Sequence, residues 1–338
     1  MVWLKFIACL VIILFAGTKL ARYGDAIGKK TGLGGVWIGL VFLAFVTSAP
    51  ELITGISSAA LVDPKVGHDL ALGTLFGSCL FNITILALLD SLYRPAPILS
   101  QARLRHVASA GVGILLMAIA AGTILAGERL SELVLGWVGI PSIAILILYL
   151  VAMRLLFRFE RSHQLPPLET TSPQYTEIPI RTVYLKFILA AAAVIGAGIW
   201  LSFVGDEIAR TTGWSTSFVG SLFLAIGTSL PELVVSVAAL RLGAIDMAVA
   251  DILGANMLDI AYVFAIDLSY SQGPILASVS GTHLITAVVV VVMSLLVIGG
   301  LRFRQKRKTF IVISWYALVL IGLYIFGAYA LFKGIGSG

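Results

Sequence analysis

The stretch that decides the fold is VTSAPEL, residues 46–52, which lies inside one of the most apolar parts of the chain. It places two hydroxyls, a Pro and a Glu together in a segment where a membrane-spanning helix carries mostly apolar side chains. GTSLPEL, residues 227–233, repeats the pattern in the second half of the chain. A fold prediction therefore has to account for the same polar group in two apolar segments.

The composition is that of an integral membrane protein. Of 338 residues, 59% are hydrophobic and 12% are charged, and the mean hydropathy is +1.03. A soluble domain carries about 25% charged residues. The formal net charge of +6 is therefore not a sign of nucleic-acid binding, and no nucleic-acid partner is expected. Cys9 and Cys79 fall in apolar segments, where we expect packing rather than a disulfide.

Ten segments are apolar and long enough to cross a bilayer, for which about 20 residues are needed. They are 2–19, 34–61, 66–90, 107–126 and 133–153, followed by 183–203, 214–241, 244–268, 282–301 and 310–332. Residues 1–19 also resemble a cleaved signal peptide, but we favour a retained helix because it makes the two halves match. The sequence thus predicts an all-α membrane protein with ten transmembrane helices. Two five-helix repeats, 1–153 and 183–338, are joined by a linker at 154–182 that is rich in Pro and charge.

Lys and Arg are distributed unequally between the two predicted sides of the membrane. If successive loops alternate, 18 of the 23 fall on the side of the linker and five fall on the other side. Because positively charged loops stay in the cytoplasm, we predict a cytoplasmic linker and both termini outside. The expected location is the inner membrane of a prokaryotic cell.

The two halves are predicted to be inverted copies, with broken helices 2 and 7. GLVFLAFVTSAPELITGISSAAL at 39–61 aligns with GSLFLAIGTSLPELVVSVAAL at 220–240, which places Glu51 and Glu232 at an offset of 181. GTLFGSCLFNI at 73–83 aligns with ADILGANMLDI at 250–260, at an offset of 177. Helices 2 and 7 are an odd number of crossings apart, so the copies enter the membrane from opposite sides. This architecture is typical of secondary transporters, whose substrate site lies near the bilayer midplane.

Each motif brings oxygen atoms to a break in its helix. The prolines lack an N–H, so the carbonyls four residues earlier lose their helical partners, and we expect Ala49 and Leu230 to leave helical geometry. An open carbonyl survives in lipid only where it lines a cavity or meets an ion. A carboxylate at the bilayer centre costs about 2.5–3.5 kcal/mol, so Glu51 and Glu232 are predicted to be functional.

Further oxygen ligands come from hydroxyls beside the two acids and from helices 3 and 8. They are Thr47, Ser48, Thr228 and Ser229 at the breaks, with Ser78, Asn82 and Asp259 on helices 3 and 8. We expect Gly77 and Gly254 to allow close backbone approach. A site of three carboxylates, an amide and several hydroxyls suits a hard cation such as Ca²⁺, which takes 6–8 oxygen ligands.

The paired motifs resemble those of the sodium/calcium exchanger family, within the wider calcium/cation antiporter superfamily. The resemblance rests on the (G)TS-x-PE and G-S/A-x-x-x-N/D patterns, in regions 39–89 and 220–266, and extends over nearly the whole chain. It implies a ten-helix exchanger with four clustered cation sites at the membrane centre, Ca²⁺ and Na⁺ as substrates, and no cofactor. It also implies the metal ligands, with Ala44 and Ala225 offering backbone carbonyls: Ala44, Thr47, Ser48, Glu51, Ser78, Asn82, Ala225, Thr228, Ser229, Glu232 and Asp259.

Several positions depart from the family pattern. Ala255 stands where the family has a Ser, which removes a side-chain oxygen from one Na⁺ site. Thr74 and Asp251 occupy positions usually held by Asn, and Asp251 adds a further acid nearby. Val46 replaces the usual Gly of the first motif. These changes are more compatible with cation exchange in general than with one fixed stoichiometry.

Charge counting predicts how the ions compete. If Glu51, Glu232 and Asp259 are ionised, three Na⁺ would neutralise the site. One Ca²⁺ would leave one negative charge, which a proton would cover because burial favours the neutral carboxyl. We therefore predict an antiporter that exchanges Na⁺ for Ca²⁺ by alternating access. An H⁺-coupled antiporter of Ca²⁺ or another divalent cation is the alternative, and Ala255 favours it.

An intramembrane acid-dependent enzyme is the alternative from another class. The surplus of neutral oxygen ligands argues against it, as does a sequence without a motif such as H-E-x-x-H, so we predict that the protein is not an enzyme. The histidines, His68, His106, His163 and His283, lie in or near predicted loops and helix ends and are expected at the surface. The lipid bilayer is the expected environment, and the oligomeric state stays open.

Overall fold

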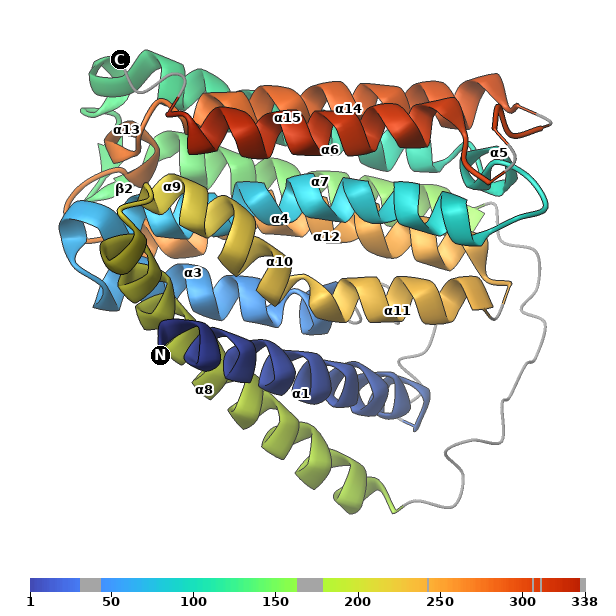
Figure 1. The fold of residues 1–338 in the computed structure, drawn as a ribbon, viewed down its shortest axis with the longest axis horizontal. Coiled ribbons are helices and arrows are strands. Elements are labelled where there is room, and N and C mark those ends of the chain that lie inside the picture. The colour runs from blue at the N-terminus through green and yellow to red at the C-terminus, as the bar shows by residue number, and fades with distance from the viewer. Residues whose placement is uncertain (31–43, 163–178, 242, 306, 311, 335–338) are drawn as a thin grey trace.

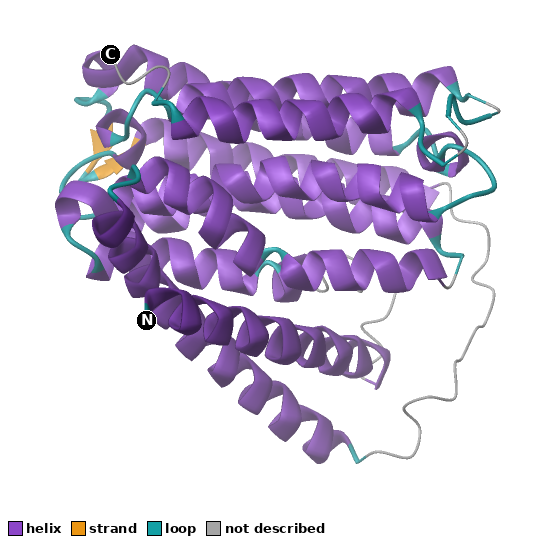
Figure 2. Cartoon of the chain, viewed as in Figure 1, coloured by secondary structure: helices purple, strands orange, loops and turns teal. Residues whose placement is uncertain are grey.

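The long helices lie side by side in a bundle (Figures 1 and 2). The computed structural model describes residues 1–30, 44–162, 179–241, 243–305, 307–310 and 312–334. Within them, eight helices are apolar and long enough to cross a membrane: α1 Val2–Lys30, α4 Pro64–Leu92, α6 His106–Ala126, α7 Ile140–Ser162, α8 Ile180–Thr212, α12 Ile245–Ser269, α14 His283–Phe303 and α15 Trp315–Phe332. The prediction of an all-helical membrane protein is confirmed at this level.

One further candidate span is a bent pair of helices. It begins with α9 (Thr216–Val219), continues through a π-helical turn, η3 (Gly220–Leu224), and α10 (Ala225–Thr228), and ends with α11 (Leu230–Arg241). The two arms, 216–228 and 230–241, meet at an angle of 44°. π-helical turns are uncommon and often mark functional sites. The bend lies within the second motif, where the sequence predicts a break.

The predicted spans fall on the helices, but several boundaries differ: α1 continues to Lys30 and α8 to Thr212, beyond the predicted ends at 19 and 203. The segment 34–61 lies partly outside the described residues, and its described part ends in α3, Ala49–Leu61. Residues 134–139, predicted to open the fifth span, form a small hairpin of β1 (Val134–Leu135) and β2 (Val138–Gly139). Gly136 has a φ of 70° in its turn, which Gly adopts without strain. The last span begins at Trp315 rather than at 310.

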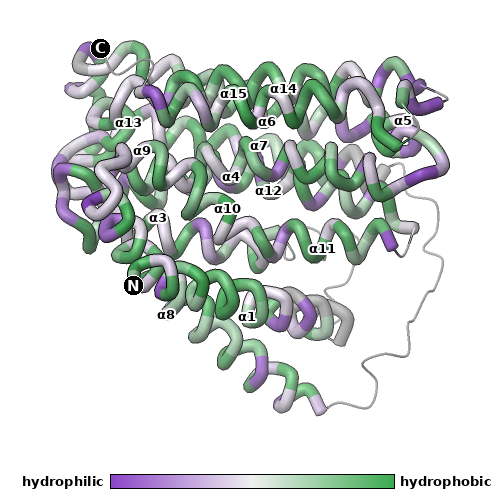
Figure 3. Tube along the Cα trace, viewed as in Figure 1, coloured by the Kyte–Doolittle hydropathy of each residue, from purple (hydrophilic) through white to green (hydrophobic). Residues whose placement is uncertain are grey.

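The predicted linker is helical at both of its ends. α7 continues to Ser162 and α8 begins at Ile180, while residues 163–178 lie outside the described residues. The start of α1 and the end of α15 lie at one end of the bundle, on the left of Figure 1, and α5 (Ile98–Gln101) lies at the opposite end. Figure 3 shows apolar residues along the helices and polar residues concentrated toward these two ends.

α4 and α12 are the most buried spans and pack against each other. Where they meet, Asn256 Nδ2 donates to the carbonyl of Cys79 at 3.2 Å, and the thiol of Cys79 donates to the carbonyl of Asn256 at 3.6 Å. These two residues are 177 apart, the offset at which the two motif regions align. The packing of the two helices is therefore reciprocal in these contacts.

Glycine allows a second close approach, between α4 and the π-helical turn. A Cβ on Gly77 would collide with the backbone of Ser221, which agrees with the close approach expected there. A Cβ on Gly254 would lie 3.9 Å from Ala44 Cβ, an ordinary contact. The counterpart of Ser221 in the first half falls at residue 40, outside the described residues, so the expectation for Gly254 stays a prediction.

Two histidines are buried, contrary to the expectation of surface positions. His106, at the start of α6, is 3% exposed, and His283, at the start of α14, is fully buried. His106 Nε2 lies 2.9 Å from Asp246 Oδ1 in α12, and His283 Nε2 lies 3.0 Å from Asp69 Oδ1 in α4. The expectation was wrong because each helix start folds against the end of a central helix from the other half.

The remaining two histidines give no further contradiction. His68 is half-buried at the start of α4, with its Nδ1 2.8 Å from the carbonyl of Pro64 in its own helix. His163 lies outside the described residues. The carboxylates that pair with the buried histidines also accept backbone N–H groups, from Arg103 to Asp246 and from Ser280 to Asp69, each at 2.8 Å.

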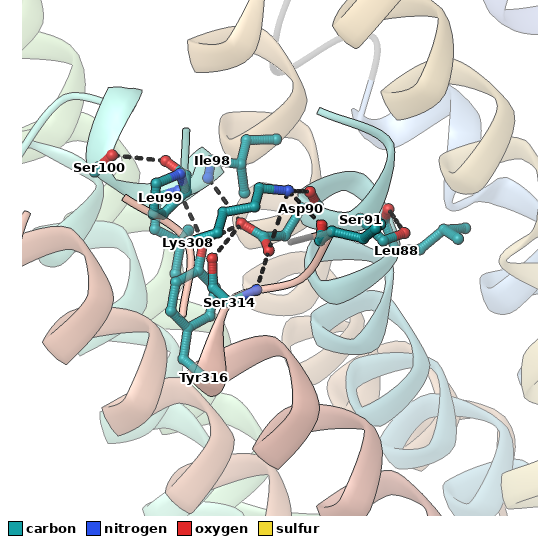
Figure 4. Close-up of polar contacts among 11 residues, drawn as sticks. Leu88, Asp90, Ser91, Ile98, Leu99, Ser100, Lys308, Ser314 and Tyr316 are labelled. Carbon is teal, nitrogen blue, oxygen red and sulfur yellow. Dashed lines mark hydrogen bonds and ion pairs between the residues drawn. The ribbon is translucent and has the colours of Figure 1, made fainter. Parts of the chain in front are cut away.

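A buried carboxylate fixes the other end of α4 (Figure 4). Asp90 accepts hydrogen bonds from the backbone N–H of Ile98 at 2.9 Å, that of Ser314 at 2.8 Å and the hydroxyl of Tyr316 at 2.6 Å. Lys308 Nζ lies 3.7 Å from the carboxylate and also donates to the Asp90 carbonyl. Burial lowers the pKa of Lys308, and the charge of Asp90 opposes that shift.

α12 ends on a matching carboxylate. Asp267 accepts hydrogen bonds from the backbone N–H of Ile275 at 2.7 Å and of Gly139 at 2.8 Å. Asp267 is 177 residues after Asp90, and in each case one bond comes from the residue eight positions later. Carboxylates thus tie down both ends of both central helices: Asp90 and Asp267 are buried, and Asp69 and Asp246 are half-buried.

Candidate cation site

Each motif breaks its helix at its serine. Ser48 has φ −83° and ψ 10°, and Ser229 has φ −83° and ψ 9°, values of the bridge region rather than of a regular helix. Ala49 and Leu230, expected to leave helical geometry, are instead the first residues of α3 and α11. The break falls one residue earlier because Pro is tolerated in the first turn of a helix, where its missing N–H is not needed.

The two serines at the breaks reach across to the opposite half of the chain. Ser48 Oγ donates to Glu232 Oε1 at 2.8 Å, and Ser229 Oγ donates to Glu51 Oε1 at 2.8 Å. All four side chains are fully buried. The two motifs, far apart in sequence, therefore lie in direct and reciprocal contact.

α4 and α12 add polar groups beside the two motifs. The hydroxyl of Ser78 lies 3.4 Å from that of Thr228, and Asn82 Nδ2 donates to Asp259 Oδ2 at 3.3 Å. We call the eleven residues that the sequence predicts as ligands the central oxygen cluster. All of them are buried in the structure: Ala44, Thr47, Ser48, Glu51, Ser78, Asn82, Ala225, Thr228, Ser229, Glu232 and Asp259.

The backbone carbonyls of the cluster are already hydrogen-bonded. The carbonyl of Ala44 accepts the Thr47 hydroxyl at 3.1 Å and the N–H of Ser48 at 2.9 Å. The carbonyl of Ala225 likewise accepts the hydroxyl and the N–H of the matching residues of the second motif, at 3.3 and 3.0 Å. A threonine hydroxyl that rotated away would free one lone pair on each carbonyl for a cation.

Four acceptor oxygens of the central oxygen cluster have no hydrogen-bond partner among the described residues. They are Glu51 Oε2, Glu232 Oε2, Asn82 Oδ1 and Asp259 Oδ1. A buried acceptor without a donor costs about 1–3 kcal/mol. Carboxylate and amide oxygens in a dry site are the ligands that hard cations prefer. The cluster is therefore a set of acceptors that a cation would satisfy.

The carboxylates alone do not make a metal site. In the described part of the chain, no three Asp, Glu, His or Cys side chains are grouped so as to hold one metal ion. A cation in the cluster would therefore be held by acids from both halves together with hydroxyl, amide and backbone oxygens.

Two buried polar residues near the cluster, Asn256 and Asp251, are not among the ligands predicted from the sequence, although Asp251 was expected as a further acid nearby. Asn256, beside Ala255 in α12, has a buried Oδ1 without a partner among the described residues. Asp251 accepts the hydroxyl of Ser236 at 3.2 Å. The spacing signalled the second of these residues, because Ser236 follows Glu232 by four residues and so shares its helix face.

Comparison with known proteins identifies the family. The family model described as sodium/calcium exchanger protein matches residues 1–156 and 182–333. Inner membrane protein YrbG of Escherichia coli is 29% identical over 273 residues, which cover 79% of each chain. The sodium/calcium exchanger MaX1 of Methanosarcina acetivorans is 26% identical over 148 residues, or 43% of this chain and 41% of that protein.

Solved structures share the fold. The sodium-calcium exchanger NCX_Mj, soaked with 100 mM Na⁺ and 10 mM Sr²⁺, superposes with a TM-score of 0.63 at 21% identity, covering 98% of this chain and 99% of that one. Native YfkE superposes with a TM-score of 0.68 at 18% identity, covering 97% and 92%. At these identities the likeness is one of architecture.

Proposed function

The chain belongs to the sodium/calcium exchanger protein family, and from that premise we propose that it exchanges Na⁺ for Ca²⁺ by alternating access at the central oxygen cluster. The family consists of membrane antiporters, so the prediction that the protein is not an enzyme is confirmed. The observation that carries the proposal is the reciprocal contact of Ser48 with Glu232 and of Ser229 with Glu51, beside four buried acceptors that have no donor among the described residues.

The same proposal includes the inverted repeat. Residues 1–153 and 183–338 are two five-helix repeats, and 154–182 join them. Contacts that recur at an offset of 177 support this division: His106 with Asp246 is matched by Asp69 with His283. A two-fold axis between the halves would place the central oxygen cluster near the bilayer midplane, as in other transporters built from inverted repeats.

Within the cluster, Glu51 and Glu232 bind the substrate cation from opposite halves. The hydroxyls of the motif threonines and serines, the groups on α4 and α12, and the carbonyls of Ala44 and Ala225 complete the shell. Because Na⁺ and Ca²⁺ draw on the same oxygens, the two ions compete rather than bind together. Access changes sides only when the charge of the cluster is neutralised.

The test is Ca²⁺ uptake into proteoliposomes, driven by an outward Na⁺ gradient and followed with radioactive Ca²⁺. Glu51→Gln and Glu232→Gln each keep the size of the side chain and remove its charge, so each lowers uptake by about a hundredfold or more. Thr84→Val is the matched control, because Thr84 only donates to the carbonyl of Leu80 in its own helix, at 2.9 Å. Full uptake in either glutamine variant contradicts the assigned role.

A proton-coupled antiporter of Ca²⁺ or another divalent cation is the second candidate. The observation that favours it is Ala255, which is fully buried and carries no oxygen at the position that matches Ser78. Ca²⁺ uptake driven by a pH gradient in Na⁺-free vesicles would support this candidate. Uptake that requires Na⁺ at every pH would favour Na⁺ coupling.

A further inference from the structure

A further buried carboxylate, Asp251, lies outside the central oxygen cluster, on one of the two helices that carry Glu232 and Asp259. Asp251 is 2% exposed and lies in α12, two turns before Asp259. Ser236, in α11 and one turn after Glu232, donates its hydroxyl to Asp251 Oδ2 at 3.2 Å. α11 leads away from the cluster and α12 returns toward it, so this pair lies between the cluster and the end of the bundle where the two helices connect (Figure 1).

The hydroxyl of Ser236 does not satisfy this carboxylate. Asp251 Oδ1 is buried and has no hydrogen-bond partner among the described residues, and none of their ion pairs includes Asp251. An acid in a membrane-spanning helix is costly unless a charge or several donors meet it, and such acids mark ion pathways. The free oxygen therefore points to a ligand that carries positive charge.

The matching positions in the first half carry no such pair. Asp251 aligns with Thr74 at the offset of 177, and Ser236 aligns with Gly55 at the offset of 181. The Thr74 hydroxyl donates to a carbonyl of its own helix at 2.8 Å, and Gly55 packs against the side chain of Ile266. Because this half folds with no acid here, packing of the bundle does not require Asp251.

We infer that Asp251 and Ser236 form an access site for Ca²⁺ on one side of the membrane only, an inference that rests on the proposed function. The carboxylate and the hydroxyl supply fewer oxygens than the 6–8 that Ca²⁺ takes, so the ion keeps part of its water there. Weak, partly hydrated binding suits a point of passage, because an ion that enters must also leave. The buried negative charge raises the local concentration of cations at the end of the bundle where α11 and α12 connect. The matching position at the other end, Thr74, has no such charge.

The experiment measures the KM for Ca²⁺ from each membrane face, in inside-out and right-side-out vesicles that contain the full chain. Asp251→Asn raises the KM about tenfold at the face where α11 and α12 connect. At the opposite face it leaves the KM within about twofold, since no charge is lost on that path. Ser236→Ala has a smaller effect at the same face. Thr74→Val, at the matching position of the other half, is the control and changes neither KM.

A change of equal size at both faces, or no change at either, overturns the inference. If Asp251→Asn does not accumulate as folded protein, two other variants test the inference. Ser236→Ala must raise the KM for Ca²⁺ at one face only, and Asp251→Glu must keep the wild-type KM at both faces. Ca²⁺ exchange that is absent from the wild type overturns the proposed function together with this inference. Exchange with an unaltered KM in Asp251→Asn overturns the access site alone.

Discussion

The two halves differ most plainly at Ser78 of the central oxygen cluster, because the second half has Ala255 at the matching position. The hydroxyl of Ser78 lies 3.4 Å from that of Thr228. The first-half counterpart of Thr228 is Thr47. Both threonine hydroxyls donate to a backbone carbonyl of their own motif, and Thr228 has the Ser78 hydroxyl nearby in addition. One Na⁺ position is therefore expected to have one ligand fewer than its mirror image.

Restoring that oxygen should strengthen Na⁺ binding. We expect Ala255→Ser to lower, by about threefold to tenfold, the Na⁺ concentration that displaces half of the bound Ca²⁺, since one added oxygen contact is worth about 1 kcal/mol. Equilibrium binding of radioactive Ca²⁺ at several Na⁺ concentrations measures this. Ala261→Ser, also buried in α12 but outside the cluster, is the control. An unchanged displacement in Ala255→Ser would show that this position faces no Na⁺.

The serines at the helix breaks give a second prediction at this scale. Ser48 and Ser229 make the same 2.8 Å contact with the glutamate of the opposite half. Ser48→Ala and Ser229→Ala should therefore weaken Ca²⁺ binding by similar factors, each within about threefold of the other, because each removes one buried hydrogen bond worth about 1–3 kcal/mol to a charged group. The same binding assay measures both. A large effect in one variant and none in the other would contradict a cluster shared equally between the halves.

At the scale of elements, α4 approaches the π-helical turn closely because of Gly77. A Cβ there would collide with backbone atoms of Ser221, which cannot rotate away as a side chain would. Gly77→Ala should therefore destabilise the protein by about 1–3 kcal/mol, as other overpacked cores are. Thermal unfolding in detergent measures this as a lower Tm. Gly111→Ala in α6 is the control, since an added Cβ meets none of the described residues within 4 Å.

The buried histidines tie elements of one half to the other. His106 holds the start of α6 to Asp246 in α12, and His283 holds the start of α14 to Asp69 in α4. His106→Ala leaves the carboxylate with one donor fewer, so we expect a loss of about 1–3 kcal/mol. Thr84→Val is the control, because the Thr84 hydroxyl donates to the carbonyl of Leu80 in its own helix. In a double-mutant cycle with Asp246→Asn, most of this loss should appear as a coupling free energy between the two residues. Fully additive effects of the two substitutions would contradict a direct bond.

At the scale of the whole molecule, the excess of Lys and Arg on the side of the linker predicts an orientation with the linker in the cytoplasm. Gln101 in α5 and Ser278 in α13 (Ile275–Ser278) are exposed and are 177 residues apart. We expect a membrane-impermeant maleimide to label Gln101→Cys from the cytoplasm and Ser278→Cys from outside. Cys9 and Cys79 are buried, so the unmodified protein is the blank. Labelling of both variants from one side would contradict the inverted repeat.

Much of the fold could be predicted because its determinants are local. The spans of α6, α12 and α14 agree with the predicted segments to within two residues, since hydropathy over about 20 residues is a property of the segment itself. The errors fall at the ends of helices. The hairpin at 134–139 and the burial of His106 and His283 depend on which distant surface packs against them, and hydropathy does not carry that information.

By itself, the sequence determined that this is a membrane protein, and it predicted Glu51 and Glu232 as the central acids of a cation site. An acid in an apolar helix carries a cost that composition and spacing already reveal. Only the tertiary structure decided which groups meet: Ser48 with the acid of the other half, His106 with Asp246, and Ser236 with Asp251. The first two pairs join residues more than a hundred positions apart, and the third joins two separate helices. No periodicity along the chain encodes such contacts, because they arise when the helices cross and exclude water.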